Sequence, residues 1–117
     1  ARLTGCKNIS RAVDLGGGEL HALDWGLRLR LPAGAEIPDH VGIRLHDVVL
    51  GRGENQAECR VVEVVEDPFS VSAMLLPLGG EGGVPFGITM DKETWRGAES
   101  DRLTVSLPAG SLLLLKE

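Results

Sequence analysis

The chain has 117 residues, 43% hydrophobic and 25% charged, which suits one ordinary domain or two very small lobes packed together. Only 3% of the residues are aromatic, so we expect an aliphatic core and little surface for stacking nucleic-acid bases. The formal net charge of −5 argues against the broad basic surface that phosphate backbones require, and we expect no nucleic-acid partner.

The excess negative charge lies in the second half of the chain. Residues 1–51 carry six basic and six acidic side chains, whereas residues 52–117 carry six basic and eleven acidic ones. The longest purely apolar run, Leu112–Leu115, is far too short to cross a bilayer, and we expect no signal peptide. Because the chain opens at Ala1 without a methionine, directly in patterned sequence, we expect it to be a piece of a longer protein.

Short segments with a period of two residues follow one another along the chain, which is typical of β-strands with one buried face. Apolar side chains alternate with polar or small ones over residues 27–31, 41–46, 69–75 and 103–107. Residues 54–67 form the longest stretch without glycine or proline, and their four valines favour a strand over a helix.

Frequent glycines (16) and prolines (6) leave little room for helices. We interpret the clusters Gly16–Gly18 and Gly79–Gly83 as hairpin turns, because neither has the Lys-Ser/Thr end and following helix of a phosphate-binding loop. Glu66–Pro68 is expected to turn between two strands rather than to supply an acid/base pair. One short helix is predicted around Asp91–Trp95, with Asp91 as its cap.

A faint internal repeat indicates two related β lobes joined near Gly51–Gly53. Both lobes are expected to contain short strands separated by tight turns, as in a sandwich or small barrels. Three pairs of segments carry the repeat. They are Gly5–Ile9 with Glu58–Val62, Gly17–Leu23 with Gly82–Ile88, and Ile43–Leu45 followed by Val48–Leu50 with Val105–Leu107 followed by Leu112–Leu114.

No group of residues indicates catalysis or metal binding. The chain has no serine nucleophile elbow with a paired base, so no catalytic residue is predicted. The two cysteines are interpreted as buried reduced thiols of a cytosolic protein, with a single disulfide as the alternative. Ligand spacing of the kind that zinc sites use is missing from His21, His40, His46, Cys6 and Cys59.

A polar junction, Arg52–Asn55, is the strongest candidate for a binding function. Arginine and asparagine can hold a tetrahedral oxyanion through charge and hydrogen bonds. The alternative is an ordinary solvated loop between two lobes.

Several stretches together resemble the C-terminal domain of the ATPases that drive molybdate or sulfate uptake in ABC transporters. No single stretch is diagnostic, but the series follows the family's order over nearly the whole chain. The stretches that carry the resemblance are Arg2–Ser10, Asp24–Gly26, Val41–Asp47, Cys59–Val62, Glu66–Phe69, Asp91–Trp95 and Leu112–Leu115.

The resemblance implies an all-β fold of two small OB-like barrel lobes of the TOBE or molybdate-binding-protein-like type, with at most short helices. Residues 1–51 would form the first lobe and residues 52–117 the second. The domain would follow a nucleotide-binding domain in the same chain, which would use ATP and Mg²⁺. Because the Walker motifs are absent from this chain, it is not expected to be an enzyme or to hold a cofactor itself.

The family's setting also implies partners and a location. The whole ATPase would work as a homodimer, in the cytoplasm, peripheral to the inner membrane and in contact with a membrane permease. We expect the dimer to form through the lobe that contains Leu112–Leu115, because strand edges of two small lobes need cover.

In some family members this domain binds the oxyanion and inhibits transport. Small domains of this type usually have a Ser-Ala-Arg-Asn-like start and a Lys-Ala-Ser-like segment before the last strand. Here Arg52 and Asn55 stand in for the first, while Pro108–Ser111 lacks the lysine of the second. Two functions stay open: a regulatory domain sensing molybdate, tungstate or sulfate, and a structural module that stabilises the ATPase dimer. The predicted oxyanion-binding residues are Arg52, Asn55, Thr89, Gly110 and Ser111, with Thr89 taken from an Ile-Thr pair common in these domains.

Overall fold

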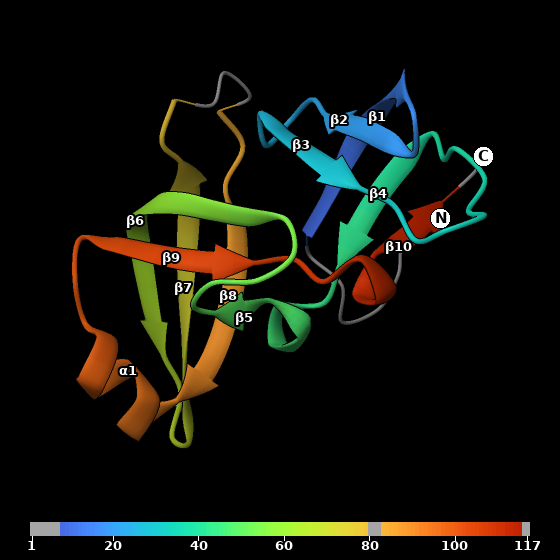
Figure 1. Cartoon of the computed structure of the whole chain (residues 1–117). Coiled ribbons are helices and arrows are strands. Elements are labelled where there is room, and N and C mark those ends of the chain that lie inside the picture. Colours follow the sequence, from blue (N-terminus) through green and yellow to red (C-terminus); the bar gives the residue numbers. More distant parts are fainter. Residues whose placement is uncertain (1–7, 80–82, 116–117) are drawn as a thin grey trace.

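The computed structural model describes residues 8–79 and 83–115, which form two five-stranded antiparallel sheets (Figure 1). One short α-helix and two single 3₁₀ turns join the strands. The elements are β1 (Asn8–Gly16), β2 (Glu19–Ala22), β3 (Leu27–Arg30), β4 (His40–Ile43), η1 (Leu45–Asp47), β5 (Val49–Leu50), β6 (Gln56–Glu66), β7 (Ser70–Pro77), β8 (Phe86–Asp91), α1 (Lys92–Ala98), β9 (Arg102–Ser106), η2 (Ala109–Ser111) and β10 (Leu113–Leu115).

Both sheets repeat one topology. The first has the strand order β10-β4-β1-β2-β3 and the second β5-β9-β6-β7-β8. In each, four strands that follow one another along the chain are completed by a fifth strand from elsewhere. The fifth strands are exchanged: β5 follows β4 but pairs with β9, and β10 follows β9 but pairs with β4 (Figure 1). These two strands therefore cross the expected division between residues 1–51 and 52–117.

The predicted period-two segments lie on β3, β4, β7 and β9, and the long segment without glycine or proline forms β6. This confirms the all-β prediction. The alternation at residues 41–46 belongs to the strand only as far as Ile43, because Leu45–Asp47 turns the chain away toward the second sheet. The predicted helix forms over Lys92–Ala98, and the Asp91 carboxylate caps it by accepting a hydrogen bond from the backbone N of Thr94 at 2.6 Å.

The predicted turns are also present. Gly16, Gly17 and Gly18 all have positive φ, which lets β1 and β2 join in a tight hairpin. At the turn after β6 the backbone N of Asp67 donates to the Ser70 carbonyl at 2.9 Å. The other predicted glycine turn, Gly79–Gly83, lies partly outside the described residues.

An aliphatic core runs between the two sheets, as the composition predicts. Leu20, Val41, Leu75 and Val105, from both sheets, are fully buried in one continuous cluster. Trp25, which follows β2, joins the lobes because its ring packs on Phe86 of β8 with centroids 5.5 Å apart.

The register of the internal repeat differs from the prediction. Asn8 pairs with Ile43 at the end of β4, and the strand pairing of β6 with β9 places Asn55 at the corresponding position beside Leu107. Asn8 therefore corresponds to Asn55, and the predicted match of Gly5–Ile9 with Glu58–Val62 is wrong in the residues that the structure describes.

Two further matches have different outcomes. Gly17–Leu23 spans β2, whereas the described part of Gly82–Ile88 enters β8, the counterpart of β3, so this match is wrong as well. Val48–Leu50 and Leu112–Leu114 do correspond, since each follows a 3₁₀ turn and leads into an exchanged fifth strand. The match of Ile43–Leu45 with Val105–Leu107 is wrong by two residues, because Ile43 corresponds to Leu107.

Candidate functional site

The predicted junction is a fixed loop between β5 and β6 that lies against the end of β9. The Ser106 hydroxyl donates to the Gly51 carbonyl at 2.7 Å, and the backbone N of Leu107 donates to the Glu54 carbonyl at 3.0 Å. At Gly53 an added Cβ would lie 3.0 Å from the Ser106 hydroxyl oxygen, so glycine lets the loop approach the strand this closely.

Asn55 ties the loop to the first sheet. Its Oδ1 accepts from the backbone N of Arg30 at 2.7 Å, while its Nδ2 donates to the carbonyls of Arg30 at 3.2 Å and Leu107 at 2.9 Å. Asn55 has a φ of 51°, a left-handed conformation that asparagine tolerates better than most residues. Its amide is thus committed to backbone groups of both sheets.

Asn8 makes the reciprocal link. Its Nδ2 donates to the Gly87 carbonyl at 2.8 Å, and its Oδ1 accepts from the Gly87 backbone N at 2.7 Å. Arg30 lies on β3 and Gly87 on β8, the third strand of each repeated set. Each asparagine therefore holds the third strand of the other half, a pairing that the sequence analysis missed.

One hydrogen bond joins the loop that holds Arg52 to the segment around η2. The backbone N of Ala109 donates to Oε1 of Glu54 at 3.3 Å, next to Gly110 and Ser111 of η2. Arg52 is exposed and forms no ion pair within the described residues. The loop therefore holds the Glu54 carboxylate against the η2 turn and carries an exposed arginine two residues earlier.

Thr89 lies apart from this group in the hydrogen-bond network of the described residues. Its hydroxyl donates to the Val71 carbonyl at 3.4 Å and accepts from the Ser72 hydroxyl at 3.2 Å. These contacts join β7 and β8, and none of them reaches the junction.

The cysteines and histidines form no site in the part of the chain that the structure describes. No group of three metal-binding side chains occurs there. Cys59 is a buried thiol, and burial raises its pKa to about 12. Cys6 lies outside the described residues, so the disulfide alternative is untested. None of the described helices is both long and apolar enough to span a membrane.

Comparison with known proteins bears on the fold. No family model matches the chain, and no curated protein sequence matches it. Similar solved structures include the cytoplasmic molybdate-binding protein ModG with molybdate bound, at a TM-score of 0.73 and 14% sequence identity, over 100% of both chains. The two chains share one fold. At this identity the likeness establishes architecture alone, and it confirms the prediction of an OB-like all-β fold with short helices.

Proposed function

We propose that this chain is a non-enzymatic module that binds a tetrahedral oxyanion of the molybdate class. The observation that carries the proposal is the full-length structural likeness to ModG, a molybdate-binding protein. The junction loop adds local support, because Arg52 is exposed, forms no ion pair within the described residues, and belongs to the loop that contacts η2 through Glu54.

The proposed setting is the C-terminal regulatory domain of an ABC transporter ATPase. In that setting the domain follows an ATP- and Mg²⁺-using domain of the same chain, in the cytoplasm at the inner membrane. A second ATPase subunit and a membrane permease are its partners. The order of the family-like stretches along the sequence supports this setting.

The proposed site consists of Arg52 with Gly110 and Ser111, and Asn55 is its weaker member. The hydroxyl of Thr89 is used between β7 and β8, so Thr89 is left out of this site. The Asn55 amide already serves three backbone groups, which leaves only its backbone for a ligand. Glu54 places a carboxylate at the same turn and opposes an anion there. Arg52 is therefore the residue whose loss should matter most.

Calorimetric titration with molybdate, tungstate and sulfate at fixed salt tests the proposal. Arg52→Ala should weaken molybdate binding by about ten- to a hundredfold, because a charge-assisted hydrogen bond contributes roughly 1.5–3 kcal/mol. Glu54→Gln, which keeps an acceptor for Ala109 N but removes the charge, should strengthen it several-fold. Arg28→Gln on β3 is the matched control for loss of one surface charge. Equal affinity in Arg52→Ala and the native chain would remove Arg52 from the site.

A structural module that stabilises a dimer is the second candidate. The commitment of both Asn8 and Asn55 to backbone links, and the missing lysine at Pro108–Ser111, favour it. In this case none of the three oxyanions binds. Sedimentation would then show a homodimer that leucine-to-lysine substitutions in Leu113–Leu115 weaken.

A further inference from the structure

A cleft away from the junction lies where the end of β7 and the start of β9 meet Trp25, and it carries two arginines and no acidic side chain among the described residues. Its volume is about 380 Å³. The walls include Arg60 of β6, Arg102 of β9, Trp25, and the apolar side chains of Leu76, Pro77 and Leu78. Arg60 lies five residues beyond Asn55 along β6, roughly 16 Å at the rise of a strand.

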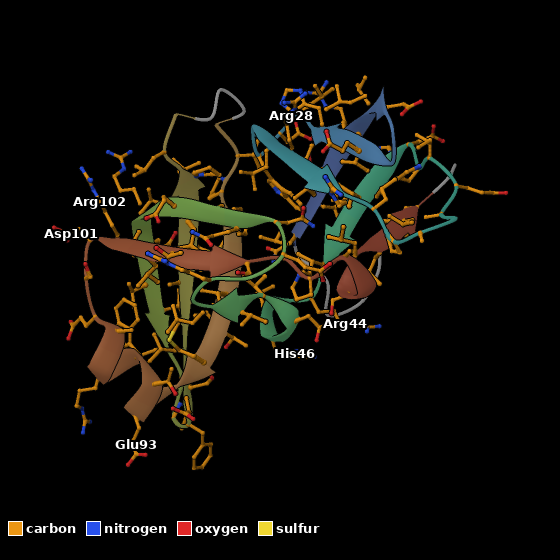
Figure 2. All side chains as sticks on the ribbon, viewed as in Figure 1. Arg28, Arg44, His46, Glu93, Asp101 and Arg102 are labelled. Carbon is orange, nitrogen blue, oxygen red and sulfur yellow. The ribbon has the colours of Figure 1, made fainter. Side chains whose placement is uncertain are left out.

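The two arginines lie side by side on one face of the sheet. Arg60 and Arg102 are cross-strand partners in the pairing of β6 with β9, and neither guanidinium forms an ion pair within the described residues. Like charges directly opposite each other on neighbouring strands repel. Figure 2 shows Arg102 projecting outward at the start of β9. Asp101, its neighbour in sequence, lines a different cleft beside α1.

Trp25 gives a second, independent observation. Its side chain lines the cleft and is 1% exposed, yet its indole Nε1 is buried with no hydrogen-bond partner among the described residues. A buried donor without an acceptor costs free energy, about 1–3 kcal/mol. A hydrogen-bond acceptor on a ligand in this cleft could satisfy this donor.

The other large cleft has the opposite character. It holds about 400 Å³ beside α1, and its lining includes the carboxylates of Glu63, Glu99 and Asp101 without a basic side chain. An anion would be repelled there. The arginine pair therefore selects the first cleft for a negatively charged ligand.

We propose that the Arg60–Arg102 cleft binds a small organic phosphate monoester. The two guanidiniums match the two charges of the phosphate group and can hold its oxygens with paired N–H donors. The apolar part of the ligand would lie on Leu76, Pro77 and Leu78. A bare oxyanion is too small to cover these side chains in a cleft of this volume, so an ester with an organic group fits better. The site is distinct from the junction and does not depend on molybdate binding.

Calorimetric titration of the chain with phenyl phosphate and with inorganic phosphate tests this site. Phenyl phosphate should bind about tenfold more tightly than inorganic phosphate. Arg60→Gln and Arg102→Gln should each weaken phenyl phosphate binding by tenfold or more, since each removes charge-assisted bonds. Arg28→Gln, on the first sheet (Figure 2), should leave it unchanged.

Trp25 supplies a local readout. Trp95→Phe leaves Trp25 as the single indole, and phenyl phosphate should then change its fluorescence with the affinity found by calorimetry. Circular dichroism of each variant checks that the β fold is retained.

Three results would overturn the site: no binding of phenyl phosphate at millimolar concentration, equal affinity in Arg102→Gln and the native chain, or equal weakening in Arg28→Gln. Molybdate titrations of the same variants keep the two proposals separate. Molybdate binding that survives Arg102→Gln but is lost in Arg52→Ala leaves the proposed function standing even if phenyl phosphate fails to bind.

Discussion

Two asparagine side chains link the two halves of this molecule through hydrogen bonds. The side-chain amides of Asn8 and Asn55 each form hydrogen bonds with backbone groups of a strand in the other half. Their chemistry suits this task, because one amide supplies both a donor and an acceptor to a backbone that needs both.

Replacing Asn55 tests this role. Asn55→Ala should lower the free energy of unfolding by about 2–4 kcal/mol, because three hydrogen bonds are lost and alanine is strained at positive φ. Asn55→Gly loses the same bonds without the strain and should be more stable than Asn55→Ala by about 1 kcal/mol. Denaturant unfolding measures both. A change below about 0.5 kcal/mol in Asn55→Ala would show that the links contribute little.

Cys59 should make the free energy of unfolding depend on pH in the alkaline range. Its pKa is raised from 9.0 to about 12 by burial, so the folded state holds the thiol proton more tightly than the unfolded state does. Its contribution is complete below pH 9 and is lost as the pH rises from about 9 to about 12. Cys59→Ala should show a smaller loss of stability over this range. An identical pH profile in the variant would contradict the assignment.

At the scale of the elements, the sequence predicts the helix and the strands with clear alternation or many valines, but it does not identify β1, β2 or β8. Period-two alternation identifies β3, β7 and β9, and Asp91 identifies the start of α1. Asp91 accepts hydrogen bonds from Thr94, which lower the pKa of the carboxyl, so the cap is fully charged near neutral pH. Each of these signals lies within a few neighbouring residues, so it can be recognised without knowing the rest of the fold.

The sheet that a strand joins depends on partners far away in the sequence, so a local pattern does not reveal it. Val49–Leu50 and Leu113–Leu115 are short apolar segments without a register signal of their own, so their exchange between the sheets could not be predicted. The predicted alignment of the two halves is wrong for a related reason. The resemblance between Cys6 and Cys59 suggested one alignment, whereas the strand pairing follows Asn8 and Asn55.

The candidate site also contains parts that the sequence predicts and parts that only the strand pairing reveals. The sequence places Arg52 and Ser111 in one site. A hydrogen bond from the backbone N of Ala109 to Glu54 joins their two segments, and a shared ligand there stays a prediction. Thr89 depended on a two-residue match, and its hydroxyl is used within the β7–β8 pair. The Arg60–Arg102 pair is invisible in the sequence, because 42 positions separate residues that only the strand register makes neighbours.

At the scale of the whole molecule, the exchanged strands make each half dependent on the other. The backbone N of Asp39, beside β4, donates to the Leu115 carbonyl, whereas that of Gly51, beside β5, donates to the Thr104 carbonyl. The first bond requires the C-terminal strand and the second does not. The two halves should therefore respond differently when that strand is removed.

Truncation after Ser111 tests this arrangement by hydrogen exchange. Without β10, the Asp39 amide should exchange much faster, because it loses the Leu115 carbonyl. The Gly51 amide, bonded to Thr104 in the second sheet, should keep its protection and serves as the internal control. Faster exchange at Gly51 with unchanged exchange at Asp39 would contradict the exchanged topology.

The proposed function requires a molybdate-class oxyanion to bind at the junction loop. Crystals grown with molybdate, measured at wavelengths on either side of the molybdenum absorption edge, test binding and position together. We predict an anomalous peak within hydrogen-bonding distance of the Arg52 guanidinium, beside Gly110 and Ser111 of η2. Crystals that contain molybdate but show no molybdenum peak on the chain would contradict the claim.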